Sequence, residues 1–330
     1  MKYSDYCGRF APSPTGLLHF GSLAAAVGSF LDAKHNHGTW LVRMEDLDTP
    51  RCVAGAADDI LRTLAAFGLH SDKPVLYQSQ RTAAYEEVLQ QLQTIGAVYP
   101  CCCTRREIAD SALHGIDGQI YPSTCRNGIP TGREGGAWRV RTDNNILSPL
   151  AGEKPRERGN FESNAPSPQP SPIKGEGVLS FNDTLQGHIS QHLENEIGDF
   201  VVKRADGLFS YQLAVVVDDA FQGITHIVRG ADLLHSTPRQ IYLQRLLGLT
   251  TPHYMHLPIA VNAQSEKLSK QTLAAPAGTD NVIATLVSVL DFLQQQPLAE
   301  LREGSVEEVL NWAVANWRLE QLKNVRKIYA

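Results

Sequence analysis

Residues 9–22 have the sequence RFAPSPTGLLHFGS, and this stretch decides the fold. A short strand is expected over residues 6–11, followed by a rigid turn rich in proline and glycine and by a helix from about Gly21. The unpaired N–H groups at such a helix start suit a phosphate, and His19 stands beside them as a donor. The stretch therefore favours a nucleotide-binding strand–turn–helix unit. An ordinary turn with a stray histidine is the alternative.

Further strands and helices alternate along the chain. A strand is expected over residues 39–44, and helices are expected over residues 56–67 and 82–95. The apolar run LAVVV at residues 213–217 is typical of a central parallel strand that is buried on both faces. This alternation predicts an α/β fold, a Rossmann-type parallel sheet with helices on its faces.

The composition narrows the class of protein. The chain has 330 residues, of which 42% are hydrophobic and 20% charged, and its formal net charge is −5. The negative net charge argues against a protein whose entire surface binds nucleic acid, although it is compatible with a local basic patch. No apolar stretch approaches the roughly 18 residues of a membrane span, and the N-terminus lacks the apolar core of a signal peptide. We therefore expect a cytoplasmic protein that has no membrane association, and no protein partner is implied.

Residues 148–177 stand apart from the rest of the chain. They are rich in Pro, Gly, Ser, Lys and Glu and nearly lack large apolar side chains, so burial cannot offset the entropy cost of ordering them. We expect a disordered surface insertion without a catalytic role. A basic tether for RNA, built from Lys154, Arg156, Arg158 and Lys174, is the alternative.

A second motif lies far along the chain, where residues 266–271 have the sequence EKLSKQ. Mobile ammonium groups such as those of Lys267 and Lys270 can stabilise the charge that develops on a triphosphate attacked at its α-phosphorus. Taken alone, this motif is more typical of a solvated surface loop. Its importance comes from its pairing with the first motif.

The two motifs together resemble those of class I aminoacyl-tRNA synthetases. HFGS at residues 19–22 is similar to their HIGH motif, and KLSKQ at residues 267–271 is similar to their KMSKS loop. The glutamyl/glutaminyl branch is indicated by three further stretches, RFAPSPTG at 9–16, RMEDLD at 43–48 and VRGADL at 228–233.

Within that branch the chain most resembles the glutamyl-Q tRNA(Asp) synthetase family, whose pattern also appears as DGLFSYQLAVVVDD at residues 206–219. The resemblance covers most of residues 5–275. Two departures from the longer synthetases, Ser22 in place of the last histidine of HIGH and an expected lack of an anticodon-binding domain, are shared by this short family.

The resemblance implies a ligase that activates L-glutamate with ATP and Mg²⁺ and transfers it to queuosine at the wobble position of tRNA(Asp). The residues implied in ATP binding are His19, Gly21, Ser22, Lys267, Ser269 and Lys270. Among these, the residues implied in catalysis are His19, Lys267 and Lys270. The residues implied in glutamate binding are Arg9, Phe10, Ala11, Pro12, Ser13, Glu45, Tyr211 and Arg229. Arginine suits a carboxylate bidentately and Glu45 suits the ammonium group, although ordinary surface ion pairs are the alternative for Glu45 and its neighbours.

Four cysteines cluster in one short region, a pattern that suits a metal better than disulfides in a reducing compartment. Cys101, Cys103 and Cys125 supply three thiolates, whereas a structural zinc needs four ligands. The family pattern makes Tyr121 the fourth ligand. Cys102, which points away from its neighbours if the chain is extended there, is expected to be a bystander. His114 as the fourth ligand, Cys102 in place of Cys101, and reduced cysteines without metal are the alternatives.

The expected organisation has four parts: the first half of the Rossmann domain at 1–100, an inserted zinc-bearing subdomain at 101–195, the second half of the Rossmann domain at 196–250, and the KMSKS-like loop with a small helical part at 251–330. Helices are expected over residues 281–295 and 306–322 in the last part. Two other functions stay open: a conventional glutamyl-tRNA synthetase that charges the 3′ end, and an inactive RNA-binding relative.

Overall fold

The computed structural model of the chain describes residues 5–110, 113–115, 118–143, 177–267 and 278–329. It divides into two compact units: residues 1–88, 182–189 and 208–330 form the first, and residues 89–181 and 190–207 form the second. The predicted boundaries at residues 100, 195 and 250 stay a prediction. Residues 148–176 of the predicted insertion lie outside the described residues.

A seven-stranded sheet with the order β3-β2-β1-β11-β12-β8-β9 runs through the first unit, which contains residues 182–189 of β8 and β9. The strands are β1 (Cys7–Phe10), β2 (Thr39–Met44), β3 (Leu76–Tyr77), β8 (Val178–Asp183), β9 (Gly187–His192), β11 (His226–Gly230) and β12 (His253–Leu257). The pairings from β3 through to β8 are all parallel. The predicted α/β fold with a mainly parallel sheet is therefore confirmed.

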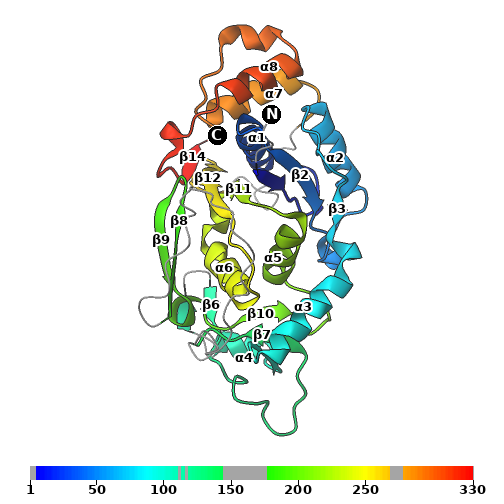
Figure 1. Cartoon of the computed structure of the whole chain (residues 1–330), viewed down its shortest axis with the longest axis vertical. Coiled ribbons are helices and arrows are strands. Elements are labelled where there is room, and N and C mark those ends of the chain that lie inside the picture. The colour runs from blue at the N-terminus through cyan, green and yellow to red at the C-terminus, as the bar shows by residue number, and fades with distance from the viewer. Residues whose placement is uncertain (1–4, 111–112, 116–117, 144–176, 268–277, 330) are drawn as a thin grey trace, which may run out of the picture. The chain divides into compact units, whose positions relative to one another are not determined.

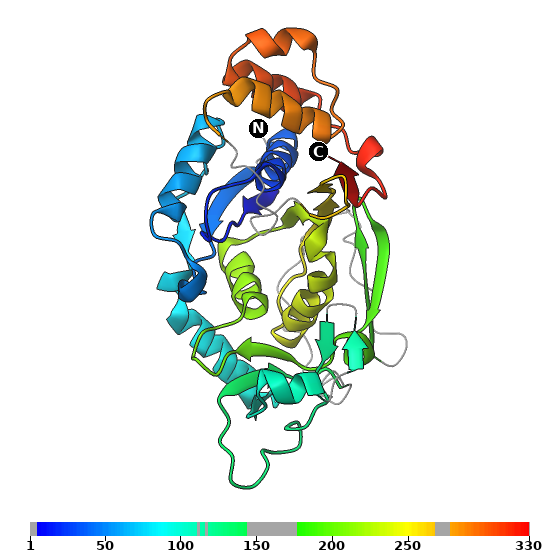
Figure 2. The ribbon, with the colours of Figure 1, turned by 180° about the vertical axis from the view of Figure 1, so that it is seen from behind.

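Helix α1 (Phe20–His35) packs on this sheet and supplies much of the core. Its Leu23, Val27 and Leu31 side chains are completely buried, and each such burial stabilises the fold by about 1.5–3 kcal/mol. Figures 1 and 2 show α7 (Val282–Phe292) and α8 (Val306–Ala315) beside α1, and residues of both helices belong to the same core. The other elements of the unit are α2 (Ala56–Ala66), the start of α3 (Thr82–Thr94), α5 (Tyr211–Gln222), α6 (Thr237–Leu246), β13 (Ile259–Val261) and β14 (Lys327–Tyr329).

The prediction of a central strand at residues 213–217 was wrong, because these residues lie inside α5. The apolar run ends at Val217, but the helix continues to Gln222. Gly223, with a φ of 68°, then ends the helix in the left-handed conformation. Asp218 and Asp219 are also buried, so the segment is covered on nearly every side and shows no helical period. The central strands are β11 and β12 instead.

The second unit contains the three-stranded antiparallel sheet β10-β7-β4 and the short hairpin β5-β6. Its strands are β4 (Val98–Cys101), β5 (Leu113–Gly115), β6 (Gly118–Ile120), β7 (Ala137–Val140) and β10 (Phe200–Lys203), and its helix is α4 (Arg105–Asp110). Buried Asp199 links several parts of this unit, since it accepts hydrogen bonds from Tyr99, from Nε and Nη2 of Arg126 and from Thr142. Within the described residues of both units, no helix is long and apolar enough to cross a membrane.

Candidate active site

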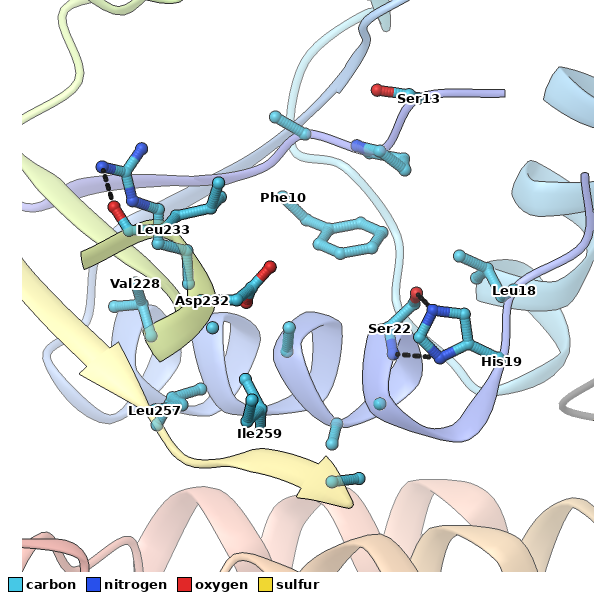
Figure 3. A pocket seen from close by; sticks show the side chains of 18 of the residues that line it. Phe10, Ser13, Leu18, His19, Ser22, Val228, Asp232, Leu233, Leu257 and Ile259 are labelled. Atoms are coloured by element: carbon cyan, nitrogen blue, oxygen red, sulfur yellow. Dashed lines mark hydrogen bonds between the residues drawn. The ribbon is translucent and has the colours of Figure 1, made fainter. Parts of the chain in front are cut away.

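A cavity of about 390 Å³ opens where β1 and β11 end and α1 begins. Ligands bind at this edge in open parallel α/β sheets, because loops and helix N-termini converge there. The lining includes Arg9, Phe10, Ala11, Pro12, Ser13, His19, Gly21, Ser22, Glu45, Tyr211, Arg229 and Lys267. Figure 3 shows Phe10 at one wall, with Val228, Leu257 and Ile259 at another.

His19 is the N-cap residue of α1, which explains where the helix starts. Its Nδ1 accepts the backbone N–H of Ser22 at 3.3 Å, and its Nε2 lies 2.9 Å from the Ser22 hydroxyl (Figure 3). These two contacts with Ser22 thus fix the imidazole ring of His19 against the first turn of α1. The helix dipole and the remaining N–H groups of this turn favour an anion in the cavity.

Two buried arginines share one carboxylate, and one of them, Arg9, lines the cavity. Asp219 of α5 accepts from Arg9 Nε at 3.1 Å and from Arg43 Nη1 at 2.7 Å. Burial by itself would raise the pKa of Asp219, but Arg43 and Arg9 outweigh it and hold the pKa below its ordinary value. Glu45 lies 3.3 Å from Arg43, and here burial prevails and raises the pKa of the carboxyl.

Arg229 lies at the end of β11, where hydrogen bonds fix its guanidinium group. Nη1 donates to the Tyr211 hydroxyl at 3.2 Å, Nη2 to the Thr237 hydroxyl at 2.8 Å, and Nε to Nε2 of His256 at 3.1 Å. Among the described residues, these partners carry no negative charge. Arg229 is only 5% exposed, so it is a buried cation that faces the cavity, and no residue in the described part of the chain forms an ion pair with it.

Lys267 lines the cavity and forms an ion pair with Asp232, whose carboxylate lies 2.6 Å from the lysine Nζ. Lys267 also forms an isolated antiparallel backbone bridge with Val261, the last residue of β13. Because both residues are partly exposed, the pair contributes little stability, and its effect is to place an ammonium group at the cavity.

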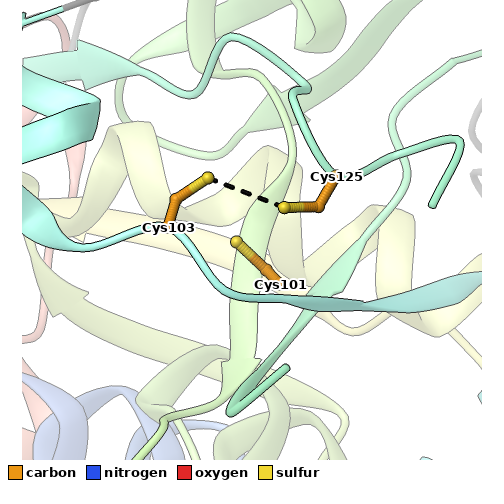
Figure 4. Close-up of side chains that lie close together, drawn as sticks. All are labelled: Cys101, Cys103 and Cys125. Atoms are coloured by element: carbon orange, nitrogen blue, oxygen red, sulfur yellow. Dashed lines mark hydrogen bonds between the residues drawn. The ribbon is translucent and has the colours of Figure 1, made fainter. Parts of the chain in front are cut away.

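A cysteine cluster lies in the second unit (Figure 4). The sulfurs of Cys101, Cys103 and Cys125 lie within 4.8 Å of one another, and Cys103 Sγ is 3.6 Å from Cys125 Sγ. Two sulfur ligands of a tetrahedral zinc stand about 3.8 Å apart, since each Zn–S distance is ~2.3 Å. The Tyr121 hydroxyl lies 3.3 Å from Cys101 Sγ and 3.4 Å from Cys103 Sγ. Three sulfurs and one oxygen therefore fit a closed, four-ligand zinc site.

Cys102 does not point away from this cluster, so that part of the prediction was wrong. Its sulfur lies 3.6 Å from Cys125 Sγ. Strand β4 ends at Cys101, and the side-chain alternation of an extended chain therefore does not carry through to Cys102. All six cysteines, each of which lies in a described range, are free thiols.

Arg139 supports the cluster from outside. Its Nε donates to Cys101 Sγ at 3.3 Å, and its guanidinium group lies 3.9 Å from the centre of the Tyr121 ring. Burial would raise the pKa of the Cys125 thiol, but hydrogen bonds led by that of Tyr121 lower it to about 7. The thiolate form that binds metal is therefore favoured at Cys125, whereas burial raises the pKa of the Cys103 thiol to about 11.

Comparison with known proteins places the chain in a family. The family model for the catalytic domain of class I tRNA synthetases (E and Q) matches residues 7–285. A glutamyl-Q tRNA(Asp) synthetase from Dechloromonas aromatica (strain RCB) is 54% identical over 319 residues, covering 96% of this chain and 95% of the relative. The Chromobacterium violaceum protein of the same name is 51% identical over 322 residues, covering 98% of this chain and 97% of its own. The chain belongs to the glutamyl-Q tRNA(Asp) synthetase family.

Solved structures agree on the fold of this synthetase family. A glutamate-tRNA synthetase from Elizabethkingia anophelis matches with a TM-score of 0.73 at 21% identity, covering 98% of this chain and 68% of that one. At this identity the likeness shows the fold alone. It agrees with the Rossmann-type architecture that the sequence predicts.

The structure brings most of the predicted synthetase residues into one cavity. All eight residues predicted for glutamate line it, as do His19, Gly21, Ser22 and Lys267. Ser269 and Lys270 lie outside the described residues, as does the side chain of His114. The roles of all these residues stay predictions.

Sequence reasoning missed several residues that shape the cavity. Asp232 belongs to the VRGADL stretch at residues 228–233. Its acidic side chain next to a predicted site could have identified it as part of the cavity. Asp219 and His256 act through arginines that lie far away in the sequence, and Thr237 acts through Arg229, which is 8 residues away. No local pattern marks such residues, because only the fold makes them neighbours.

Proposed function

We propose that the chain activates L-glutamate with ATP to form glutamyl-adenylate and then transfers glutamate to queuosine at the wobble position of tRNA(Asp). One observation carries the proposal: a single cavity holds a helix N-terminus with His19, the ammonium group of Lys267 and the buried cation of Arg229. These groups suit a nucleotide triphosphate next to a di-acid. The names of the relatives supply the tRNA and the amino acid.

In the first step, an oxygen of the glutamate α-carboxylate attacks the α-phosphorus of ATP. The bond from that phosphorus to the bridging oxygen breaks, and pyrophosphate leaves. The chain contributes position and charge rather than a covalent intermediate. His19 and the first turn of α1 bind phosphate oxygens, while Lys267 and Lys270 stabilise the charge that builds on the leaving group. Mg²⁺ enters with ATP, bound mainly by phosphate oxygens and water.

Glutamate recognition follows from the charges of the cavity wall. Because Asp219 already neutralises part of the charge of Arg9 and Arg43, Arg229 is the stronger attraction for a carboxylate. Glu45 provides the negative charge for the ammonium group, and Tyr211 contributes its hydroxyl beside Arg229.

In the second step, a hydroxyl of the queuosine ring attacks the carbonyl carbon of glutamyl-adenylate and AMP leaves. The acceptor distinguishes this reaction from that of a conventional glutamyl-tRNA synthetase, where the attacking hydroxyl belongs to the 3′-terminal ribose. The proposed setting of the reaction is the cytoplasm.

We further propose that Cys101, Cys103, Tyr121 and Cys125 bind one structural Zn²⁺. The fit of the three sulfurs and the phenol oxygen supports this. Burial, followed by the hydrogen bond with Cys101, raises the pKa of Tyr121, so zinc must displace its proton to bind the phenolate. Four protein ligands leave no open position for a reacting water.

Two measurements test the proposed function. The first is ATP–pyrophosphate exchange in the presence of glutamate, glutamine or aspartate, where we expect exchange with glutamate alone and without tRNA. The second is transfer of labelled glutamate to tRNA(Asp) that contains or lacks queuosine, followed by nuclease mapping of the labelled nucleotide. Label on the wobble nucleotide is expected.

Other outcomes identify the alternatives. Robust charging of tRNA transcripts that lack queuosine, with label on the 3′ end, indicates a conventional glutamyl-tRNA synthetase. Absence of any exchange indicates an inactive RNA-binding relative.

A further inference from the structure

We propose that Asp183 and His256 form a positioning pair that orients Arg229 for glutamate: Asp183 fixes the His256 tautomer whose bare Nε2 accepts the Nε–H of Arg229. This inference rests on the proposed function only in naming glutamate as the ligand. Neither residue belongs to the lining of the cavity, so the pair acts through Arg229.

The three side chains form one buried chain of hydrogen bonds within the first unit. His256 Nδ1 lies 2.6 Å from Asp183 Oδ2, and Arg229 Nε lies 3.1 Å from His256 Nε2. His256 is completely buried, while Asp183 and Arg229 are 4% and 5% exposed. Water therefore has little access to replace any of these bonds.

Asp183 can only accept in this position. Its Oδ1 receives the backbone N–H groups of Leu185, Gln186 and His256, at 3.0, 2.9 and 3.2 Å. Its other oxygen faces His256 Nδ1, which must then carry the proton. The imidazole is neutral, since burial lowers the pKa of His256 to about 4. One proton on Nδ1 leaves Nε2 bare, as the Nε–H of Arg229 requires.

The bond to His256 determines which edge of the guanidinium group faces the cavity. A planar guanidinium has five N–H donors in a fixed fork, so anchoring Nε fixes the directions of the other four. The Tyr211 hydroxyl then receives one N–H from Nη1, while Nη2 donates to the Thr237 hydroxyl and, at 3.5 Å, to the backbone carbonyl of Leu233. A carboxylate entering the cavity meets a cation that is already oriented, which lowers the entropy cost of binding.

The sharpest test is Asp183→Asn, which has almost the same shape. The three backbone donors require the amide oxygen at the Oδ1 position, so the NH₂ group must face His256 Nδ1. His256 then accepts at Nδ1 and moves its proton to Nε2, where it opposes the Nε–H of Arg229. We expect the KM for glutamate in pyrophosphate exchange to rise about tenfold, because a hydrogen bond to a charged group is lost. The KM for ATP should stay close to that of the wild type.

The tautomer itself is measurable without activity. In ¹⁵N-histidine-labelled full-length protein, the His256 signals are assigned by their loss in His256→Gln. We expect a protonated Nδ1 and a bare Nε2 in the wild type, and the reverse in Asp183→Asn. The His256→Gln variant retains an oxygen that can accept from Arg229, so its KM for glutamate should lie between those of the wild type and Asp183→Asn.

Gln186→Met is the matched structural control. Gln186 is buried beside Asp183 and donates to the backbone carbonyls of His256 and Val325, both at 2.9 Å, but it does not touch the imidazole nitrogens. We expect a lower unfolding temperature with an unchanged KM for glutamate. The inference is overturned by any of three results. These are an equal rise in the KM of this control, an unchanged KM for glutamate in Asp183→Asn, and a wild-type His256 whose Nε2 is protonated. Absence of glutamate-dependent exchange in the wild type instead defeats the proposed function, and the ¹⁵N spectra still decide whether the pair exists.

Discussion

The buried imidazole of His256 links the stability of the fold to pH. Burial lowers the pKa of His256 to about 4 in the folded protein, against an ordinary value of about 6.5 in an unfolded chain. Between these values the unfolded chain binds a proton that the folded protein does not bind. Stability therefore falls as the pH decreases from about 6.5 to 4, by up to about 3 kcal/mol from this residue.

Urea unfolding at pH 7 and pH 4.5 measures this effect. We expect His256→Gln to lose less stability than the wild type between the two values, because glutamine takes up no proton. An identical loss in both proteins would show that the imidazole is already charged in the folded state.

The proposed role of a second single residue, Lys270, can also be tested, although Lys270 lies outside the described residues. If its ammonium group follows the charge on the leaving pyrophosphate, Lys270→Ala should lower glutamate-dependent exchange by about 10²-fold. The KM for glutamate should change little, because the side chain acts on the triphosphate. Lys323→Ala, which removes an exposed lysine from the C-terminal segment, is the control. Equal exchange rates in both variants would mean that Lys270 has been given the wrong role.

Single residues also show how far the sequence predicts this site. The motifs around His19 and Lys267 and the arginines at strand ends were recognisable, because each sits in a local pattern with a chemical meaning. Asp183 and His256 have no such pattern, since their partner Arg229 comes from a different strand. The direction of the Cys102 side chain was predicted wrongly for a related reason, because it depends on where β4 ends.

At the scale of elements, sequence patterns predict those segments that have one exposed face or clear end signals. Strand β2 covers residues 39–44 as predicted, because Gly38 precedes it and an acidic stretch follows it. Helix α5 defeats the same reasoning. Five apolar residues do not distinguish a buried helix from a buried strand, and here Asp218 is buried too, accepting hydrogen bonds from Gln78, Arg81 and Tyr85.

The turn between α1 and β2 requires a glycine for lack of space. A Cβ at Gly38 would lie 2.7 Å from the backbone oxygen of Tyr6, which accepts the N–H of Thr39 and cannot withdraw. We expect Gly38→Ala to destabilise the protein by about 1–3 kcal/mol, as overpacking does elsewhere. Gly278→Ala is the matched control, because a Cβ there meets no atom of the described residues within 4 Å. Chemical denaturation of the two variants gives the comparison, and similar midpoints would contradict the steric argument.

At the scale of the whole molecule, the cysteine cluster of the second unit differs from the core of the first unit in what holds it together. The first unit contains a large apolar core that includes Trp40, Leu23 and Phe67. In the second unit, the cluster around Cys101 and Cys125 contains few apolar residues, and the Asp199 network is polar. The second unit buries apolar side chains elsewhere, including Val140, Phe200 and Val202. Its cysteine cluster therefore depends more on a bound metal than the rest of the unit does, since the free energy of metal binding adds directly to folding.

Removal of the proposed zinc should therefore affect one unit selectively. After treatment with a chelator, we expect faster amide hydrogen exchange in peptides around Cys101, Cys125 and Asp199, and unchanged protection in α1 and β2. Alanine at Cys103 should reproduce this pattern without the chelator, because three ligands bind zinc more weakly than four. Glutamate-dependent pyrophosphate exchange serves as the control for the first unit and should persist, since its cavity is lined by residues of that unit alone. The contrary result is unchanged protection around the cysteines in protein that metal analysis shows to have lost its zinc. It would mean that the cluster is held by its own hydrogen bonds and that the metal is not structural.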